Sequence, residues 1–296
     1  MSGYFLALAL GLATQGAALH LLTVPTQGDS LSCSTSPVDK SFGKKKLWDG
    51  YEVSVGPTSH FEDDSGADDA CTAAIHDHSG KEVYRTTGPG VMLDPATGMD
   101  IDGDGAPDVV LMNGSSGGSW DIEVVSLKPQ PHLLFKFEED SPPAPFRKDS
   151  QGRVALWSWE PLYLNRYYSI PNALARIYRV KALRFANGEL RDITGEYCGE
   201  MEKGRDFPRP TKNEMEDLKK SKITSGEFEN LDDQESAAKV LSLIVQYIFC
   251  RRFEEALDVI HQAWPEQDRA SLMKSLQEIL KDGDCPECAS RIEQWR

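Results

Sequence analysis

The chain is poor in basic residues and lacks long apolar runs, and both shortages narrow its possible functions. It has 32 Lys and Arg against 47 Asp and Glu, a formal net charge of −15. Such a surface repels phosphate backbones, so we expect no nucleic-acid partner. Beyond the N-terminal segment, no stretch reaches the roughly 20 apolar residues that a membrane-spanning helix needs. The acidic balance is compatible with binding of divalent cations.

Sustained helical periodicity is absent from the first 200 residues, and the hydrophobic content is modest. Hydrophobic residues make up 40% of the chain, and 24 Gly with 17 Pro imply many turns. This composition favours β structure with loops over a helical bundle. A chain of 296 residues is long enough for two modest domains.

The N-terminus resembles an export signal, although no Lys or Arg precedes its apolar stretch. Residues Tyr4–Ala13 have the length of a signal-peptide core, and Gly16–Ala18 offers small residues for cleavage. A buried helix, a wrongly assigned start codon and a retained membrane anchor are the alternatives. We predict a signal peptide over residues 1–18, a linker over 19–46 and a periplasmic or extracellular protein, membrane-attached only if the segment is not cleaved.

The cysteine content is even, at six residues: Cys33, Cys71, Cys198, Cys250, Cys285 and Cys288. In an exported chain this permits disulfides, with fifteen possible complete pairings. Three cysteines precede residue 200 and three follow it, so complete pairing requires at least one bond between the two halves. Cys285 and Cys288 form a C-x-x-C, for which we expect a structural disulfide. Free thiols, a redox pair, or a zinc site with Cys250 and His261 are the alternatives.

Short apolar runs separated by turns predict a mainly antiparallel β domain over residues 47–198, propeller-blade-like or a sandwich. Asp77–Gly80 and Asn187-Gly188 are hairpin cues. The expected strands are Tyr51–Val55, Thr72–Ile75, Glu82–Arg85, Val109–Met112, Asp121–Leu127, His132–Phe137, Val154–Trp159, Ala175–Phe185 and Glu189–Ile193.

The composition changes over residues 199–210, a predicted linker, and helical spacing follows over residues 211–296. Asp232–Glu235 resembles a capping box. Apolar stripes at spacings of three and four then cover Val240–Ile248, Ala256–Trp264 and Met273–Leu280, with Pro265 just inside the third helix. We therefore predict an α+β fold in which a small C-terminal helical domain stacks against the β domain.

An acidic loop carries the strongest chemical signal in the sequence. Asp100, Asp102, Asp104 and Asp108 occupy positions one, three, five and nine of a nine-residue segment. Calcium prefers about six to eight hard oxygen ligands, and alternating carboxylates on a tight turn supply several of them. The backbone carbonyl of Ala106 fits position seven. The pattern predicts a Ca²⁺ site formed by these five residues.

Two alternatives compete with this prediction. An EF-hand needs a bidentate Glu at position twelve, where this chain has Leu111. An acidic turn closed by side-chain hydrogen bonds needs no metal, but four crowded carboxylates repel one another in the absence of a cation. Over roughly Gly98–Asn113 the loop resembles the calcium loop of FG-GAP/VCBS repeats, found in integrin-type propellers and in many secreted bacterial proteins. That resemblance implies an exported, calcium-binding β module; with a single copy of the loop, we expect no complete propeller.

Weaker patterns point to other chemistry. Ser116 lies in a Gly-x-Ser-x-Gly segment, but the nucleophile elbow of hydrolases needs a following helix, and a strand is predicted there. His76 and His78 are candidate metal ligands or members of a solvated turn. Trp157 and Trp159 share one side of a strand, where they stack on sugars or pack in the core.

Two function classes follow from these patterns. We favour an exported, calcium-binding, non-catalytic module that interacts with a protein or a polysaccharide. The alternative is a secreted hydrolase that uses the β domain. No acid–base pair or nucleophile–base spacing supports catalysis, so we do not expect an enzyme. The sequence leaves the oligomeric state open.

Overall fold

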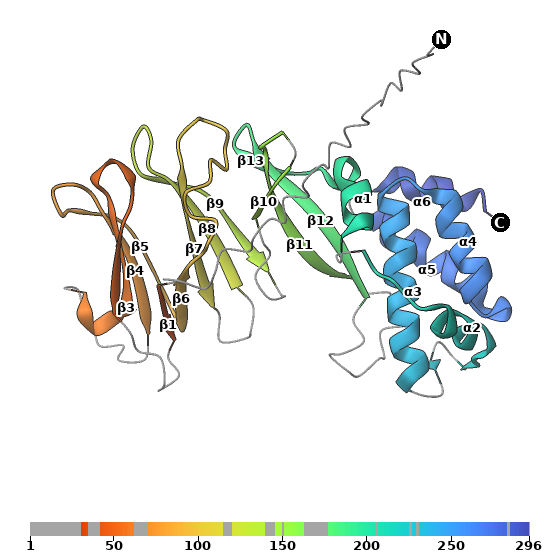
Figure 1. The fold of residues 1–296 in the computed structure, drawn as a ribbon. Helices are drawn as coiled ribbons and strands as arrows, with labels where there is room; N and C mark the ends of the chain where they lie inside the picture. Colours follow the sequence, from red (N-terminus) through yellow and green to blue (C-terminus); the bar gives the residue numbers. More distant parts are fainter. Residues whose placement is uncertain are drawn as a thin grey trace, which may run out of the picture.

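Antiparallel sheets in the first two thirds of the chain and helices in the last third confirm the predicted α+β class (Figure 1). The computed structural model describes residues 31–34, 42–61, 70–114, 120–139, 146–149, 151–162, 177–204, 207–224, 227–228, 231–282 and 285–295. The predicted signal peptide, most of the predicted linker and Ser116 lie outside these residues. Within them, no helix is both long and apolar enough to cross a membrane.

Three sheets make up the β part, each a meander of strands paired in chain order. The first sheet contains β2 (Gly43–Lys46), β3 (Glu52–Pro57), β4 (Cys71–His76) and β5 (Glu82–Gly88). The second contains β6 (Gly90–Leu93), β7 (Asp108–Gly114), β8 (Trp120–Ser126) and β9 (His132–Glu139), with β1 (Ser32–Ser34) added beside β6. The third contains β10 (Phe146–Lys148), β11 (Val154–Leu162), β12 (Ile177–Ala186) and β13 (Glu189–Asp192).

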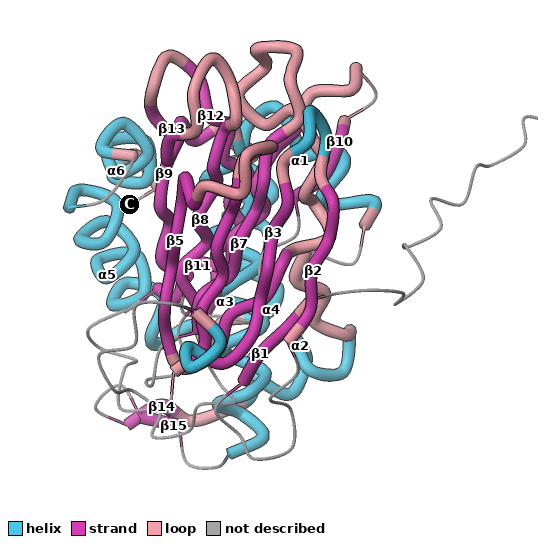
Figure 2. Tube along the Cα trace, turned by 90° about the vertical axis from the view of Figure 1, so that its left-hand side faces the viewer, coloured by secondary structure: helices cyan, strands magenta, loops and turns pink. Residues whose placement is uncertain are grey.

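The sheets are stacked face to face, as the view along the stack shows (Figure 2). Because successive side chains of a strand point to opposite faces, β7 can contact both neighbouring sheets. Val109 and Leu111 pack in a core with the first sheet. Val110 and Met112 pack in a second core with the third sheet. At β7, the second sheet is therefore buried on both faces.

The helices cover the far face of the third sheet (Figure 1). They are α1 (Thr194–Lys203), α2 (Lys212–Lys220), α3 (Leu231–Phe249), α4 (Phe253–Ala263), α5 (Arg269–Asp282) and α6 (Pro286–Glu293), and a short hairpin of β14 (Ile223–Thr224) and β15 (Glu227–Phe228) precedes α3. Along β11, Val154 and Leu156 face the second sheet, whereas Ala155 and Trp157 pack with α1 and α3 residues. The same alternation thus joins the sheets to the helices.

Gln246 of α3 completes the hydrogen bonding of β12. β13 pairs only with Leu183–Ala186, so the N–H and C=O of Val180 on that side face α3 instead. The Gln246 side chain accepts from Val180 N (2.9 Å) and donates to Val180 O (3.2 Å). This contact satisfies two buried backbone groups that would otherwise cost free energy.

Three disulfides join distant or adjacent elements. Cys33–Cys71 links β1 of the second sheet to β4 of the first, and Cys198–Cys250 links α1 to the end of α3. The second bond confirms that the two halves of the chain are covalently joined. Cys285 and Cys288 pair with each other, at the start of α6. The structure therefore confirms a disulfide at the C-x-x-C.

Several local predictions were wrong. Asp232–Glu235 lies inside α3, and the capping box of this region is at Thr211 and Glu214, before α2. Pro265 precedes a 3-10 turn over Glu266–Asp268 instead of starting α5. The helices α1, α2 and α6 and the short strands β1, β2, β6, β10, β14 and β15 were not predicted, because elements of this length carry little periodicity.

Candidate metal centre

The acidic loop connects β6 to β7, the central strand of the stack. The loop is closed at its base by backbone hydrogen bonds from Gly98 N to Asp108 O (2.8 Å) and from Asp108 N to Met99 O (2.7 Å). Gly103 and Gly105 have φ angles of 80° and 86°, a left-handed conformation that glycine adopts without steric cost. The loop can therefore wind its acidic side chains around one centre.

Three of the predicted ligands come together. Carboxylate oxygens of Asp100, Asp102 and Asp108 all lie within 4.8 Å of one another. Asp104 is not part of this cluster: its Oδ1 accepts a hydrogen bond from the N–H of Ala106 (2.7 Å). Ligation by Asp104 and by the Ala106 carbonyl stays a prediction.

Backbone N–H groups hold the clustered carboxylates in place. Asp100 accepts from Gly103 N (2.8 Å) and Gly105 N (3.0 Å), one for each carboxylate oxygen. Asp102 Oδ1 accepts from Asp104 N (3.0 Å), and Asp108 Oδ2 accepts from Ile101 N (2.8 Å). Such bonds close acidic turns with or without a metal, so they fix the geometry but do not by themselves indicate a ligand.

Asp108 does point to a ligand. The residue is fully buried, and its Oδ1 has no hydrogen-bond partner. Burial raises the pKa of Asp108 from 3.8 to about 6, and the nearby charges of Asp102 and Asp104 add to the rise. Burial and the charges of Asp104 and Asp100 also raise the pKa of Asp102. In the described part of the chain, no ion pair neutralises any of the loop carboxylates.

A turn in the third sheet shows how this chain neutralises a comparable carboxylate. Asp149, between β10 and β11, accepts from the N–H groups of Gln151 and Arg153 and also pairs with the Arg153 guanidinium (2.7 Å). The loop between β6 and β7 contains no Lys or Arg. Its all-oxygen donor set is the kind that hard cations such as Ca²⁺ prefer, so the residues fit such an ion.

The other sequence-derived metal candidates do not form the predicted sites. Among the described residues, His76, Asp77 and His78 are not part of any group of three close metal ligands. The zinc site with Cys250 and His261 was wrong, because Cys250 is bonded to Cys198.

The C-x-x-C lies beneath an arginine. The guanidinium of Arg251 contacts the sulfurs of Cys285 and Cys288 and pairs with Glu287. A cation at this position opposes metal binding by the same sulfurs.

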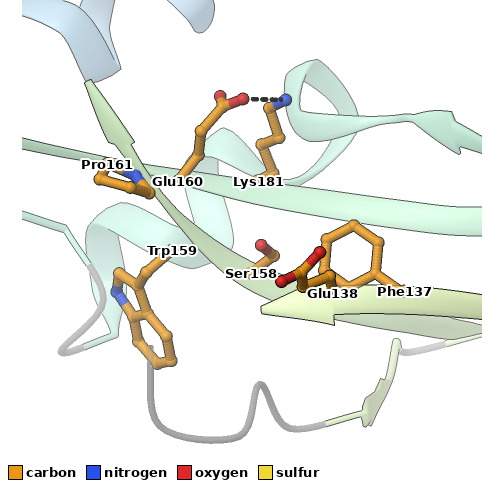
Figure 3. Close-up of a pocket in the computed structure, with 7 residues that line it drawn as sticks. All are labelled: Phe137, Glu138, Ser158, Trp159, Glu160, Pro161 and Lys181. Carbon is orange, nitrogen blue, oxygen red and sulfur yellow. Dashed lines mark hydrogen bonds and ion pairs between the residues drawn. The ribbon is translucent and has the colours of Figure 1, made fainter. Parts of the chain in front are cut away.

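The two tryptophans of β11 have different environments. Trp157 is buried in the core beside the helices, and Trp159 is partly exposed. Trp159 lines a pocket together with Ser158 and Lys181 (Figure 3). No sequence pattern indicated Ser158 or Lys181, since a lone serine and a lysine on different strands form no motif.

No protein-family model and no curated protein matches this sequence. Similar solved structures include a periplasmic inhibitor of I-type lysozyme from Aeromonas hydrophila, alone and in complex with a lysozyme from Meretrix lusoria. The first shares 15% identity over 34% of this chain and 90% of its own, and the second 16% over 34% and 88%, each with a TM-score of 0.24. At such low TM-scores the likeness says nothing about the fold or function of this chain.

Proposed function

We propose that this protein is an exported, non-catalytic binding protein whose second sheet is braced by one calcium ion in the acidic loop. The observation that carries the calcium proposal is Asp108, a fully buried carboxylate with one oxygen unpartnered, beside Asp100 and Asp102. A buried carboxylate without a counter-charge is costly, and a divalent cation removes that cost.

A calcium ion bound in the acidic loop would stabilise β7, the central strand of the second sheet. Asp108 is the first residue of β7, whereas Asp100 and Asp102 belong to the loop before it. An ion shared by these residues would tie the loop to β7. Because β7 packs against both neighbouring sheets, tightening it stabilises the whole β part.

The disulfides support export. All six cysteines are paired. Disulfides form and persist in oxidising compartments such as the periplasm and the extracellular space and are rare in the cytosol. The signal-like segment at residues 1–18 agrees with this proposal, and N-terminal sequencing of protein from the periplasmic or culture fraction tests it. An intact Met1 on cytoplasmic protein would contradict export.

The described side chains are compatible with the proposed binding role. Cysteine nucleophiles are absent because every thiol is in a disulfide. Among the described residues, no histidine ring is hydrogen-bonded to a serine hydroxyl or to a carboxylate, the contact that an activated nucleophile requires. A protein or a polysaccharide is the partner we propose.

Calcium-dependent melting tests the brace. Extracellular calcium modules bind at ~10⁻⁴–10⁻³ M. At 10 mM calcium, which is about ten to a hundred times such a dissociation constant, binding to the folded state alone adds about 1.4 to 2.7 kcal/mol of stability. We therefore expect millimolar calcium to raise the melting temperature measured in chelator, and calorimetry to show one site.

Asp77→Ala is a matched control for Asp100→Ala. Each carboxylate accepts two backbone hydrogen bonds in a turn, but Asp77 has no acidic cluster around it. Both variants should lose some stability in chelator, and only Asp100→Ala should lose the calcium-dependent shift. Equal melting of the wild type in chelator and in calcium, with no heat of binding, would refute the calcium site.

A further inference from the structure

The disulfide of the C-x-x-C lies at the start of α6, under a single ion pair. Pro286 and Glu287, between the two cysteines, are exposed, whereas Cys285 and Cys288 are 1% and 0% exposed. The guanidinium of Arg251 contacts both sulfurs and pairs with Glu287. The side chains of Arg251 and Glu287 are 49% and 62% exposed. On this side, one layer of side chain that itself faces water therefore lies between the sulfurs and solvent.

Arg251 occupies a backbone position that usually belongs to glycine. It follows the end of α3, where its N–H donates to Ile248 O (2.9 Å), and its φ angle is 61°. Glycine is the common residue at this left-handed position after a helix, because a side chain meets a steric penalty there. Such a conformation persists where surrounding contacts hold it, and here the side chain contacts the two sulfurs and Glu287.

The charge of Arg251 favours reduction of this disulfide. A cation beside a sulfur stabilises the thiolate, which is the form that a disulfide yields when it is reduced. Cys285 is the N-cap of α6 and Cys288 lies in its first turn, so the positive end of the helix dipole acts in the same direction. A disulfide whose reduced form is stabilised is easier to reduce.

The other two disulfides lack this environment. Among the described residues, no Arg or Lys donates a hydrogen bond to the sulfurs of Cys33–Cys71 or Cys198–Cys250. These two bonds span 38 and 52 residues, whereas Cys285–Cys288 spans 3. Closure of a long loop restricts the unfolded chain more than closure of a short one, so the two long-range bonds contribute more to stability. The C-x-x-C can therefore be reduced with the least effect on the fold.

We propose that Cys285–Cys288 is a redox-active disulfide that accepts two electrons from a dithiol. The sequence left such a pair open beside a structural disulfide. One thiolate of the dithiol attacks one of the two sulfurs, forms a mixed disulfide and releases the other cysteine as a thiolate beside Arg251. The second thiolate of the dithiol then breaks the mixed disulfide, which releases the second cysteine and leaves the dithiol oxidised to its own disulfide. The protons of the dithiol pass to solvent or to the released sulfurs.

This activity goes beyond the proposed binding function and needs no calcium. Equilibration of the full-length protein with mixtures of reduced and oxidised dithiothreitol, in chelator, tests it. After acid quenching and alkylation, peptide mass spectrometry gives the reduced fraction of each disulfide. Cys285–Cys288 should reach half reduction at a ratio of reduced to oxidised dithiothreitol at least about tenfold lower than the other two pairs. A short peptide that carries a reduced C-x-x-C is the second reductant; reduction by dithiothreitol alone would restrict the partner to small dithiols.

Two variants of Arg251 test the role of the cation. Arg251→Gln removes the charge, and Arg251→Gly removes it in a residue that suits the left-handed backbone. Both should raise the dithiothreitol ratio for half reduction of Cys285–Cys288 about threefold to tenfold, because a neighbouring positive charge favours the thiolates. Arg251→Lys keeps the charge and should shift the ratio less. Arg291→Gln is the matched control: Arg291 lies in α6, its side chain is 51% exposed and it pairs with Glu254, so the ratio should not change.

Melting curves identify a variant that fails to fold, and Arg251→Gly keeps the test informative if Arg251→Gln does so. Three results would overturn the proposal. The first is half reduction of all three disulfides at one ratio. The second is reduction of Cys285–Cys288 only after the protein has been unfolded in urea. The third is a ratio that neither Arg251→Gln nor Arg251→Gly changes.

Discussion

Asp108 is an acidic residue at a position that the stack otherwise fills with apolar side chains. The remaining residues of β7 are also buried, and Val109 to Met112 alternate between two cores. The Ile101 N–H donates to one of its oxygens, the other oxygen has no hydrogen-bond partner, and the carboxylate lies close to those of Asp100 and Asp102. The stability of the folded protein and the binding of the proposed calcium ion therefore both depend on Asp108.

Asp108→Asn should separate these two effects. In chelator at pH 7.5 we expect the variant to be more stable than the wild type, because the amide carries no buried charge. The rise of the Asp108 pKa from 3.8 to about 6 sets roughly 3 kcal/mol as the upper limit of this gain. In calcium the order should reverse, since the variant lacks a charged ligand. Chemical denaturation in both buffers measures this crossing; a variant that is equally stabilised by calcium would contradict it.

The ion pair of Asp149 should make the stability of the protein depend on pH in the acidic range. Although burial raises its pKa, hydrogen bonds from Arg153 and Tyr197 lower the pKa of Asp149 well below its ordinary value of 3.8. A lowered pKa favours the folded state above the unfolded-state value, and this contribution is lost as the pH falls through the folded-state value. Asp149→Asn should therefore destabilise the protein at pH 7, and the difference from wild type should shrink below about pH 4. Urea unfolding between pH 2.5 and pH 7 measures it, and a constant difference would argue against the ion pair.

At the scale of elements, side chains of α3 hydrogen-bond to backbone groups of β12 that no neighbouring strand pairs with. Besides the two bonds of Gln246, the hydroxyl of Ser242 accepts from Tyr178 N (3.0 Å). Side chains one helical turn apart thus satisfy successive backbone groups of a strand. The helix cannot slide along the sheet without breaking these bonds.

Gln246→Leu should orphan both the N–H and the C=O of Val180. Each unsatisfied buried group costs about 1–3 kcal/mol, so we expect a loss of roughly 2 kcal/mol or more. Gln262→Leu, on the exposed face of α4, is the control and should change stability by less than about 0.5 kcal/mol. Equal unfolding free energies for the two variants would show that the Gln246 contacts contribute nothing.

The disulfides should differ in their stabilising effect. Cys198–Cys250 closes 52 residues and joins the α1 end of the β part to α3, whereas Cys285–Cys288 closes only 3. A longer loop loses more chain entropy on closure, so replacing the first pair by serine should cost about 2–4 kcal/mol and the second pair less. Thermal denaturation of the two double variants compares them directly; the reverse order would contradict the entropic explanation.

At the scale of the whole molecule, the layers share their cores. The second sheet contributes to the cores with the first and the third sheet, and the third sheet contributes to the core with the helices. No layer that lies inside the stack can lose its neighbour without exposing apolar side chains such as Val110 or Trp157. Stability is thus distributed over the stack.

We therefore expect one cooperative thermal transition for the described β and helical parts together. The calorimetric and van't Hoff enthalpies should agree, as they do for two-state unfolding. Asp108→Asn and Gln246→Leu, which lie in different layers, should both shift the same transition. Two resolved transitions, each responding to only one of these variants, would show that the layers unfold independently.

Local patterns in the sequence predicted much of the architecture. The hairpin at Asn187-Gly188 forms with φ angles of 56° and 86°, and Asp77 closes the predicted turn between β4 and β5. The spacing of Asp100 and Asp102 brings them together because backbone bonds within the loop dictate its curvature. Interactions among residues a few positions apart depend little on the remaining chain, so the sequence by itself determined the longer strands, the helices α3, α4 and α5, and the acidic loop.

Only the tertiary structure decided which surfaces meet. Gln246 contacts Val180 across 66 positions, and Cys198 pairs with Cys250 instead of with any other cysteine. The burial of Asp108 likewise follows from how the sheets stack. Contacts of this kind depend on the packing of whole faces, because many pairings of apolar faces are compatible with the same local pattern, and the complete set of buried side chains selects one of them.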